Sequence, residues 1–111
     1  IVMRKKAAHR GRDRLERRAA ILKALAHPSR LMMVEALAEG EKCVCELQKL
    51  VGADISTVSK HLSVMKRAGL VECERRGLQV FYTLLSPCIL NFFSCVESVI
   101  EAHQEAGVVV S

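Results

Sequence analysis

Apolar residues recur at helical spacing early in the chain, and a proline divides this stretch into two predicted helices. The first helix is predicted around positions three or four residues apart: Leu15, Ala19, Leu22 and Leu25. It should end at His27, because the residue before a proline disfavours the helical conformation. Pro28 suits the first turn of a second helix, and Gly40 is suited to end that helix.

The next two predicted helices are short and are separated by a glycine turn. The first covers about 43–51, with Val44, Leu47 and Val51 facing inward, and Gly52 makes the turn. The second begins at a cap, either Asp54 or Ser56, and runs to about 68. Its buried stripe has the cleanest helical period in the chain: Ile55, Val58, Leu62 and Met65. This pair predicts a helix-turn-helix.

After Gly69 the pattern changes to that of a β-hairpin followed by one more helix. Two strands are predicted over 70–74 and 78–84, with Arg75-Arg76-Gly77 as the tip. Ser86-Pro87 opens a last helix whose apolar stripe is wider than a small domain needs: Ile89, Phe92, Phe93, Val96, Val99 and Ile100. Surplus apolar surface at a terminal helix indicates a subunit interface.

The element order predicts a mainly α fold with a small β-hairpin wing. We expect a winged helix-turn-helix of α+β class, in the order ααααββα, that dimerises through its terminal helices. Residues 13–106 should form this domain, with a flexible basic arm over 1–12 and a frayed tail over 107–111. At 111 residues the chain has room for one core, completed by a partner subunit.

The net charge of +5 is unevenly distributed. Residues 1–18 carry eight of the 17 basic residues and two of the 12 acidic ones, so the basic excess lies at the N-terminal end. Such a segment either tracks phosphates or is a solvated tail.

Composition also limits the cellular context. No segment has the roughly 18 apolar residues that span a bilayer, and charges occupy the place of a signal peptide's apolar run. We therefore expect a cytoplasmic protein without a membrane partner. Five cysteines in a reducing compartment favour free thiols, metal ligation or redox chemistry over a disulfide framework.

Three runs of the sequence resemble the ArsR/SmtB family of winged-helix repressors. They are Ala26-His27-Pro28-Ser29-Arg30-Leu31, then Ser56 to Leu62 followed by Lys66 to Val71, and the wing from Glu74 to Tyr82. The resemblance covers about residues 15–103. It implies a transcriptional repressor that binds an inverted repeat in double-stranded operator DNA as a homodimer. The fourth helix would lie in the major groove and the wing along the adjacent backbone.

The exposed face of that fourth helix has the side chains that a groove-reading helix needs. Hydroxyls and long cations contact phosphates and base edges, and they stand at Ser56, Thr57, Ser59, Lys60, Ser63 and Arg67. We also assign Arg75 and Arg76 of the wing to DNA binding. His61 is either a phosphate contact or merely exposed.

The run from Glu41 to Leu47 contains Cys43-Val44-Cys45, and it resembles the cysteine box of the arsenic and cadmium sensors in this family. Thiolates are the ligands that soft ions prefer. The resemblance therefore implies As(III), Sb(III) or a soft divalent metal such as Cd, Pb or Zn as inducer, without an organic cofactor. On a regular helix, residues two apart differ by about 200°, so we expect one ion to bind both sulfurs only if the first turn unwinds.

A third thiolate is not obvious, because Gln48 stands where the arsenic box usually has another cysteine. Cys73 is interpreted as core packing. Cys88 and Cys95 are seven residues apart and share a helix face, so each is either a metal ligand or part of the interface. The family's other site, on the last helix, is poorly matched, and Glu97, Glu101 and His103 are interpreted as a solvated face.

Two alternatives change the signal or the class of protein. Thiol oxidation or persulfidation would have Cys43 or Cys45 react toward Cys88 or Cys95. A metal-buffering protein on a relic winged helix is the second alternative. An enzyme is not expected, because the sequence contains no phosphate loop, no nucleophile with a base and no paired carboxylates in a plausible pocket.

Overall fold

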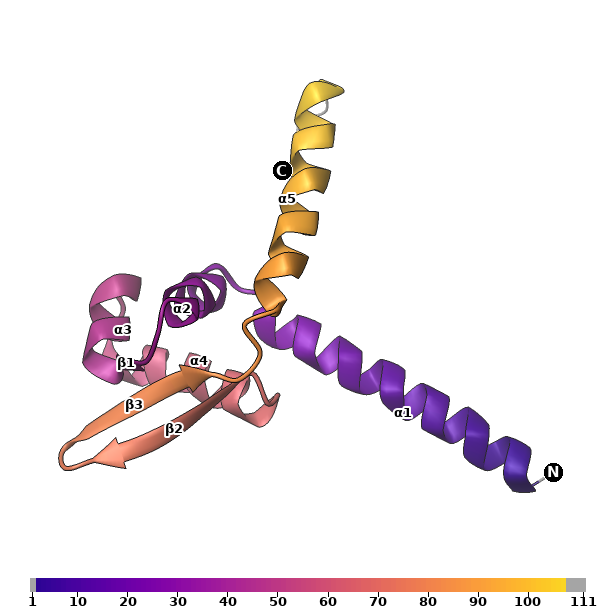
Figure 1. The fold of residues 1–111 in the computed structure, drawn as a ribbon, viewed down its shortest axis with the longest axis horizontal. Coiled ribbons are helices and arrows are strands. Elements are labelled where there is room, and N and C mark those ends of the chain that lie inside the picture. Colours follow the sequence, from indigo (N-terminus) through magenta and orange to yellow (C-terminus); the bar gives the residue numbers. More distant parts are fainter. Residues whose placement is uncertain (1, 108–111) are drawn as a thin grey trace.

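The computed structural model describes the backbone of residues 2–107 and the side chains of residues 11–107. A body made of three helices and a small sheet carries two terminal helices, α1 and α5, which project from it in different directions (Figure 1). The elements are α1 (Val2–Leu25), α2 (Pro28–Ala38), β1 (Lys42–Cys43), α3 (Val44–Val51), α4 (Ile55–Arg67), β2 (Val71–Arg76), β3 (Gln79–Leu84) and α5 (Ile89–Glu105). The predicted winged helix-turn-helix is confirmed.

Local signals in the sequence explain where the helices of the body begin and end. The His27 ring caps α2 by accepting a hydrogen bond from the Ser29 N–H at 3.0 Å, and Pro28 opens the helix. Asp54, rather than Ser56, caps α4: its carboxylate accepts from the Thr57 N–H at 2.8 Å, and hydrogen bonds from Thr57 hold the pKa of this carboxyl below its ordinary value. Gly52, with φ 74°, ends α3 in the left-handed conformation that favours glycine.

The core lies where α2, α3 and α4 meet the last residues of α1 and the base of the wing. Val58, Leu62 and Met65 of α4 are fully buried, as the helical period predicts. Ile55 is wrongly placed in that stripe, because its side chain is 48% exposed at the first turn of α4. The other core residues are Ala24, Leu25, Met33, Val34, Leu37, Leu47, Leu70, Val71 and Leu84.

The sheet has three antiparallel strands in the order β1-β3-β2, so it contains one strand more than the sequence predicts. The additional strand, β1, is two residues long and pairs Lys42 with Tyr82 and Cys43 with Phe81. The hairpin turn is at Gly77-Leu78, with φ 62° at the glycine. Arg75 and Arg76 therefore end strand β2 instead of forming the tip.

The first helix begins well before Leu15. The backbone is helical from Val2, so the predicted arm over 1–12 continues α1 without a break at Arg12. At the other end, Gly107 follows α5 in a turn, while 108–111 of the predicted tail lie outside the described residues.

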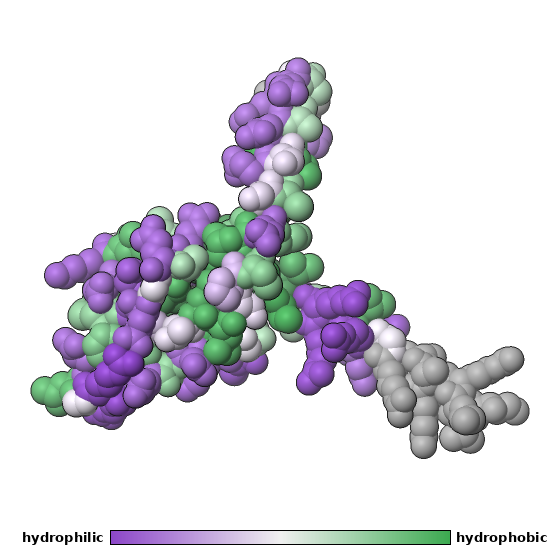
Figure 2. Space-filling view, viewed as in Figure 1, coloured by the Kyte–Doolittle hydropathy of each residue, from purple (hydrophilic) through white to green (hydrophobic). Residues whose placement is uncertain are grey.

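Much of the apolar stripe of α5 is uncovered: Phe92, Val96 and Val99 are exposed, while Ile89 and Phe93 are only partly buried against the core. Together with α1 and α2 this stripe lines a groove of about 440 Å³, bordered by Leu22, Leu25, Ala26, Leu31, Glu35, Phe92, Phe93, Val96, Glu97 and Ile100. Figure 2 shows apolar side chains gathered where α5 and α1 leave the body. No helix in the described part of the chain combines the length and the apolar character that crossing a membrane requires.

Candidate DNA-binding surface and thiol site

The polar face of α4 is fully presented to solvent. All six residues that the sequence assigns to the groove are exposed: Ser56, Thr57, Ser59, Lys60, Ser63 and Arg67. Buried Val58, Leu62 and Met65 fix the opposite face of the helix in the core. The helix is therefore anchored on one side and free to contact a ligand along its whole length on the other.

His61 differs from its neighbours because it packs against α2. Its ring is half-buried and lies 4.3 Å, centroid to centroid, from the ring of His27. The Arg30 guanidinium lies 3.2 Å from His61 Nδ1. Burial, followed by the charges of His27 and Arg30, lowers the pKa of His61. The expectation that His61 is merely exposed is wrong, and the structure makes it part of the joint between α2 and α4.

The two wing arginines have different surroundings. The Arg75 side chain donates only to the Gly77 carbonyl, at 3.3 Å. Arg76 makes a bidentate ion pair with Glu41, at 2.6 and 2.7 Å, and donates a third hydrogen bond to Glu74 at 2.9 Å. Its guanidinium also stacks over Phe81, and the carboxylates raise its pKa above the ordinary value. Of the two wing arginines, Arg75 therefore makes no ion pair within the described residues 11–107.

Cys43 and Cys45 are adjacent in space because helix α3 starts between them. Cys43 is buried and caps the helix with extended backbone, φ −79° and ψ 160°, whereas Cys45 is exposed in the first turn. Because the backbone of Cys43 is extended rather than helical, the 200° separation of two residues on one regular helix does not apply to this pair, and both cysteines line one hollow. The Cys43 N–H donates to the Glu46 carboxylate at 3.2 Å, which fixes this turn.

The two thiols also differ chemically. The hydrogen bond with Cys45, with a further contribution from burial, raises the pKa of the Cys43 thiol above its ordinary value, against the opposing effect of the Glu46 N–H. Because the thiolate is the nucleophile, Cys43 is poorly activated while it stays protonated. Exposed Cys45 is the sulfur that a reagent in solution reaches first.

Both cysteines border one hollow between helix α4 and the wing. The hollow measures about 400 Å³ and is lined by Cys43, Val44, Cys45, Gln48, Ile55, Ser59, Leu78, Gln79, Val80 and Tyr82. The lining thus includes Ser59 of the DNA-facing surface and the tip of the wing. The two cysteines therefore lie beside α4 and the tip of the wing.

The remaining cysteines lie elsewhere. Cys73 is half-buried on β2 and pairs with Tyr82, while Cys88 and Cys95 are exposed at the start and the middle of α5. None of the three lines the hollow. Within residues 11–107, no group of three or more histidine, cysteine, aspartate or glutamate side chains is placed to hold a metal ion.

Sequence reasoning missed one residue that belongs to this region. Glu41 precedes β1 and joins the segment that carries Cys43 to the wing through Arg76. Its position in the sequence carries no signal, because the pairing spans 35 residues and depends on the unpredicted strand β1.

An anchored helix with an exposed polar face, preceded by a tight turn and followed by a hairpin, defines a winged helix-turn-helix regulator that binds DNA. Residues 27–72 match the family described as bacterial regulatory protein, arsR family. A biofilm growth-associated repressor from Xylella fastidiosa is 42% identical over 80 residues, covering 68% of this chain and 70% of that protein. The chain belongs to the ArsR family, whose members are transcriptional regulators and not enzymes.

Solved structures confirm the fold. A homodimeric winged helix-turn-helix domain from Mycobacterium bovis superposes with a TM-score of 0.73 at 32% identity, over 87% of this chain and 90% of that one. The transcriptional repressor BigR from Xylella fastidiosa gives 0.68 at 34% identity, over 83% and 94%. These relatives support the family without specifying an arsenic or cadmium sensor, so that part of the resemblance stays a prediction.

Proposed function

We propose that this chain is a homodimeric repressor that binds an inverted-repeat operator and leaves it when Cys43 and Cys45 are oxidised or persulfidated. The observation that carries the proposal is the hollow bordered by both sulfurs, the recognition helix and the wing tip. The thiol pair and Ser59 of the DNA-binding face of α4 line the same hollow.

The DNA-binding half of the proposal rests on the exposed face of α4. Lys60 and Arg67 can reach guanine acceptors or phosphates, and the hydroxyl residues beside them bond bases or phosphates. Two copies related by a twofold axis would place their recognition helices about 34 Å apart, one turn of DNA. Homodimeric relatives and the uncovered stripe of α5 support the twofold arrangement.

The thiol half follows from the different environments of the two sulfurs. The Cys45 thiolate attacks a hydroperoxide, the O–O bond breaks, and Cys45 becomes a sulfenic acid as an alcohol or water leaves. The Cys43 thiol then attacks the Cys45 sulfur, water leaves, and a disulfide forms. With a sulfane-sulfur donor, Cys45 becomes a persulfide and the attack of Cys43 releases hydrogen sulfide. Cys88 and Cys95 do not line the hollow, so we assign the reaction to this pair.

Disulfide formation would disturb the wing through β1. Sulfurs in a disulfide are about 2.05 Å apart, closer than two free thiols can approach, so the turn that carries Cys43 and Cys45 must rearrange. Cys43 pairs with Phe81 of β3, and the preceding segment is tied to Arg76 through Glu41. A displacement of Cys43 is therefore transmitted to the wing. Release requires a coupling free energy of about 1 to 3 kcal/mol, the usual allosteric range.

A soft metalloid or metal is the second candidate signal, and one observation favours it. Both sulfurs border one open hollow, and thiolates are the ligands that As(III) and Cd prefer. A third ligand would have to come from the partner subunit or from a small thiol in solution.

Fluorescence anisotropy on DNA distinguishes the two signals. The probe is a duplex enriched by in vitro selection with the reduced protein. Release by hydroperoxide or polysulfide in buffer with a chelator, reversed by dithiothreitol, supports the thiol mechanism. Release by arsenite or cadmium in reducing buffer supports the second candidate instead. Failure to enrich any duplex would contradict the repressor itself.

Cysteine variants then locate the sensor. Cys45→Ser and Cys43→Ser should bind the duplex like the wild type but no longer respond, and serine at 43 retains a helix cap. Cys73→Ser is the matched control, because Cys73 lies on β2 outside the hollow. An unchanged response in both of the first two variants would overturn the assignment.

A further inference from the structure

We infer that Arg14, Arg17 and Arg18 of α1, together with Arg67 of α4, form a second surface that binds the DNA backbone beyond the half-site read by α4. The inference rests on the proposed function, since it extends the footprint of the same complex. Its partner is the phosphate backbone of double-stranded DNA, without regard to base sequence.

The sequence of α1 directs these arginines toward α4. Residues three, four and seven apart lie on one face of a helix. Arg14, Arg17 and Arg18 share the face of Ile21, Ala24 and Leu25, and Ala24 and Leu25 are buried in the core. The face that fastens α1 to the body thus continues outward as a row of arginines.

A different face of α1 carries the apolar residues Leu15 and Leu22, which are 61% and 47% exposed. Subunit contacts use apolar surface of this kind, so a dimer that covers it leaves the arginine face available. Helix α1 would thus contact the partner subunit through its apolar face and DNA through its arginine face.

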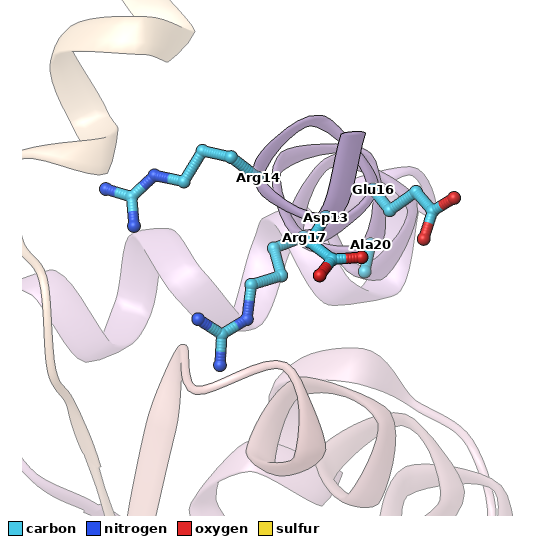
Figure 3. A pocket seen from close by; sticks show the side chains of 5 residues that line it. All are labelled: Asp13, Arg14, Glu16, Arg17 and Ala20. Atoms are coloured by element: carbon cyan, nitrogen blue, oxygen red, sulfur yellow. The ribbon is translucent and has the colours of Figure 1, made fainter. Parts of the chain in front are cut away.

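The arginines meet the end of the recognition helix around a second hollow. This hollow measures about 440 Å³ and is lined by Arg14, Arg17, Arg18, Ala20, Ile21, Arg67 and Ala68. All four of its charged lining residues are arginines. In Figure 3, Arg14 and Arg17 extend from α1 away from Glu16.

No carboxylate among the described side chains lines the second hollow, and the two nearest along α1 border the hollow next to it. Asp13 and Glu16 line the adjoining hollow with Arg14 and Arg17, and Glu16 is ion-paired with Arg12 at 3.3 Å. Within residues 11–107, the four arginines of the second hollow make no ion pair with a carboxylate.

A DNA duplex is the anion that fits this arrangement. Four guanidinium groups close together repel one another, and a regular array of phosphates relieves that repulsion. Arg67 belongs both to the exposed face of α4 and to the hollow, so the basic surface is continuous with the groove-reading face. DNA that lies along α4 would reach the α1 arginines where it leaves the half-site.

The salt dependence of DNA affinity tests this inference directly. Each phosphate contact contributes about 0.9 to the slope of log affinity against log salt concentration, and a dimer loses two contacts per substitution. Arg14→Ala, Arg17→Ala and Arg18→Ala should therefore each reduce the slope by about 2. They should weaken selected and unrelated duplexes by the same factor, and Arg17→Lys should restore the slope. Arg12→Ala is the matched control, because Arg12 does not line the hollow.

The outcomes separate this inference from the proposed function. Wild-type protein that binds no selected duplex contradicts the proposed function. Wild-type protein that binds and responds to oxidant, while all three alanine variants keep its slope, overturns only the inference. Sedimentation of each variant must give the wild-type oligomer, and a reduced slope that appears only with dissociation also overturns it.

Discussion

The winged-helix body and the two terminal helices bury their apolar residues to very different extents. The body encloses its core completely, with Met33, Val34, Val58, Leu62 and Met65 wholly inaccessible to solvent. Helix α5 has no fully buried residue: Ile89, Leu90 and Phe93 are partly buried against the core, and Phe92, Val96 and Val99 are between 42% and 59% exposed. The body therefore has the buried core of a folded domain, whereas the terminal helices expose apolar residues as one side of a subunit interface does.

This difference separates folding from assembly. Helix α1 belongs to both parts, because Ala24 and Leu25 close the core while Leu15 and Leu22 are left exposed. A partner subunit that covers α5 and the exposed face of α1 would complete the second apolar layer. The thiol hollow and helix α4 belong to the body, so under the proposed function each subunit has its own thiol pair and its own DNA-binding helix.

The largest effect is expected from the core of the body. Leu62→Ala removes a side chain with no exposed area and should lower the free energy of unfolding by about 3 kcal/mol. Urea denaturation followed by circular dichroism measures the loss. Leu78→Ala, at a wing-tip residue that is 97% exposed, should leave the free energy of unfolding unchanged. Equal losses in the two variants would contradict the placement of the core.

The next largest effect should be a weaker dimer, with the fold of each subunit unchanged. Phe92→Ala removes an exposed ring from the α5 stripe, and burial of such a ring stabilises an interface by about 2 kcal/mol per subunit. Sedimentation velocity should show a weaker dimer with an unchanged circular dichroism spectrum. Ser98→Ala is the control, because Ser98 lies on the opposite side of α5. A dimer insensitive to Phe92 would place the interface elsewhere.

A smaller effect should distinguish the two arginines of the wing. Arg75→Ala should weaken DNA binding by about 1 kcal/mol, since this cation is free to contact a phosphate. Arg76→Ala should have less effect on affinity, because its guanidinium already bonds Glu41 and Glu74. Anisotropy on the selected duplex measures both. The reverse order would mean that DNA displaces the two carboxylates.

The sequence predicted the body better than its edges, for physical reasons. Helix α4 has a strong period because one face meets a dry core, so three of its four predicted stripe residues are buried. Ile55 differs because the first turn of α4 extends past the core and borders the thiol hollow. Strand β1 has two residues, too few for any period, and exists only through its pairing with β3.

The sequence predicted which residues form the candidate site, but only part of how they are arranged. The Cys43-Val44-Cys45 spacing identified the thiol pair, but a start of α3 at Cys43 suggested opposite faces of a helix. The extended backbone at Cys43 comes from strand pairing across 38 residues, which local sequence does not encode. The inward position of His61 similarly depends on His27 and Arg30, which are distant in the chain.

The smallest effect is expected in the pH dependence of thermal stability, which tests the contact between α2 and α4. A guanidinium only donates hydrogen bonds, so His61 Nδ1 must accept from Arg30, which requires a neutral ring. The His27 ring, which caps α2 by accepting from the Ser29 N–H, packs against the other side of this contact. Protonation of His61 removes this acceptor and places a second positive charge beside the Arg30 guanidinium.

The sign of the effect follows from the lowered pKa of His61. A histidine whose folded pKa is below its unfolded value of 6.5 contributes stability above that pH, and the contribution is lost as the pH falls toward the folded pKa. Between about pH 7.5 and about pH 5.5 the wild-type melting temperature should therefore fall more than that of His61→Gln. His103→Gln, at an exposed position on α5, should behave like the wild type. Parallel melting curves for all three proteins would mean that this histidine pair does not link the recognition helix to the body.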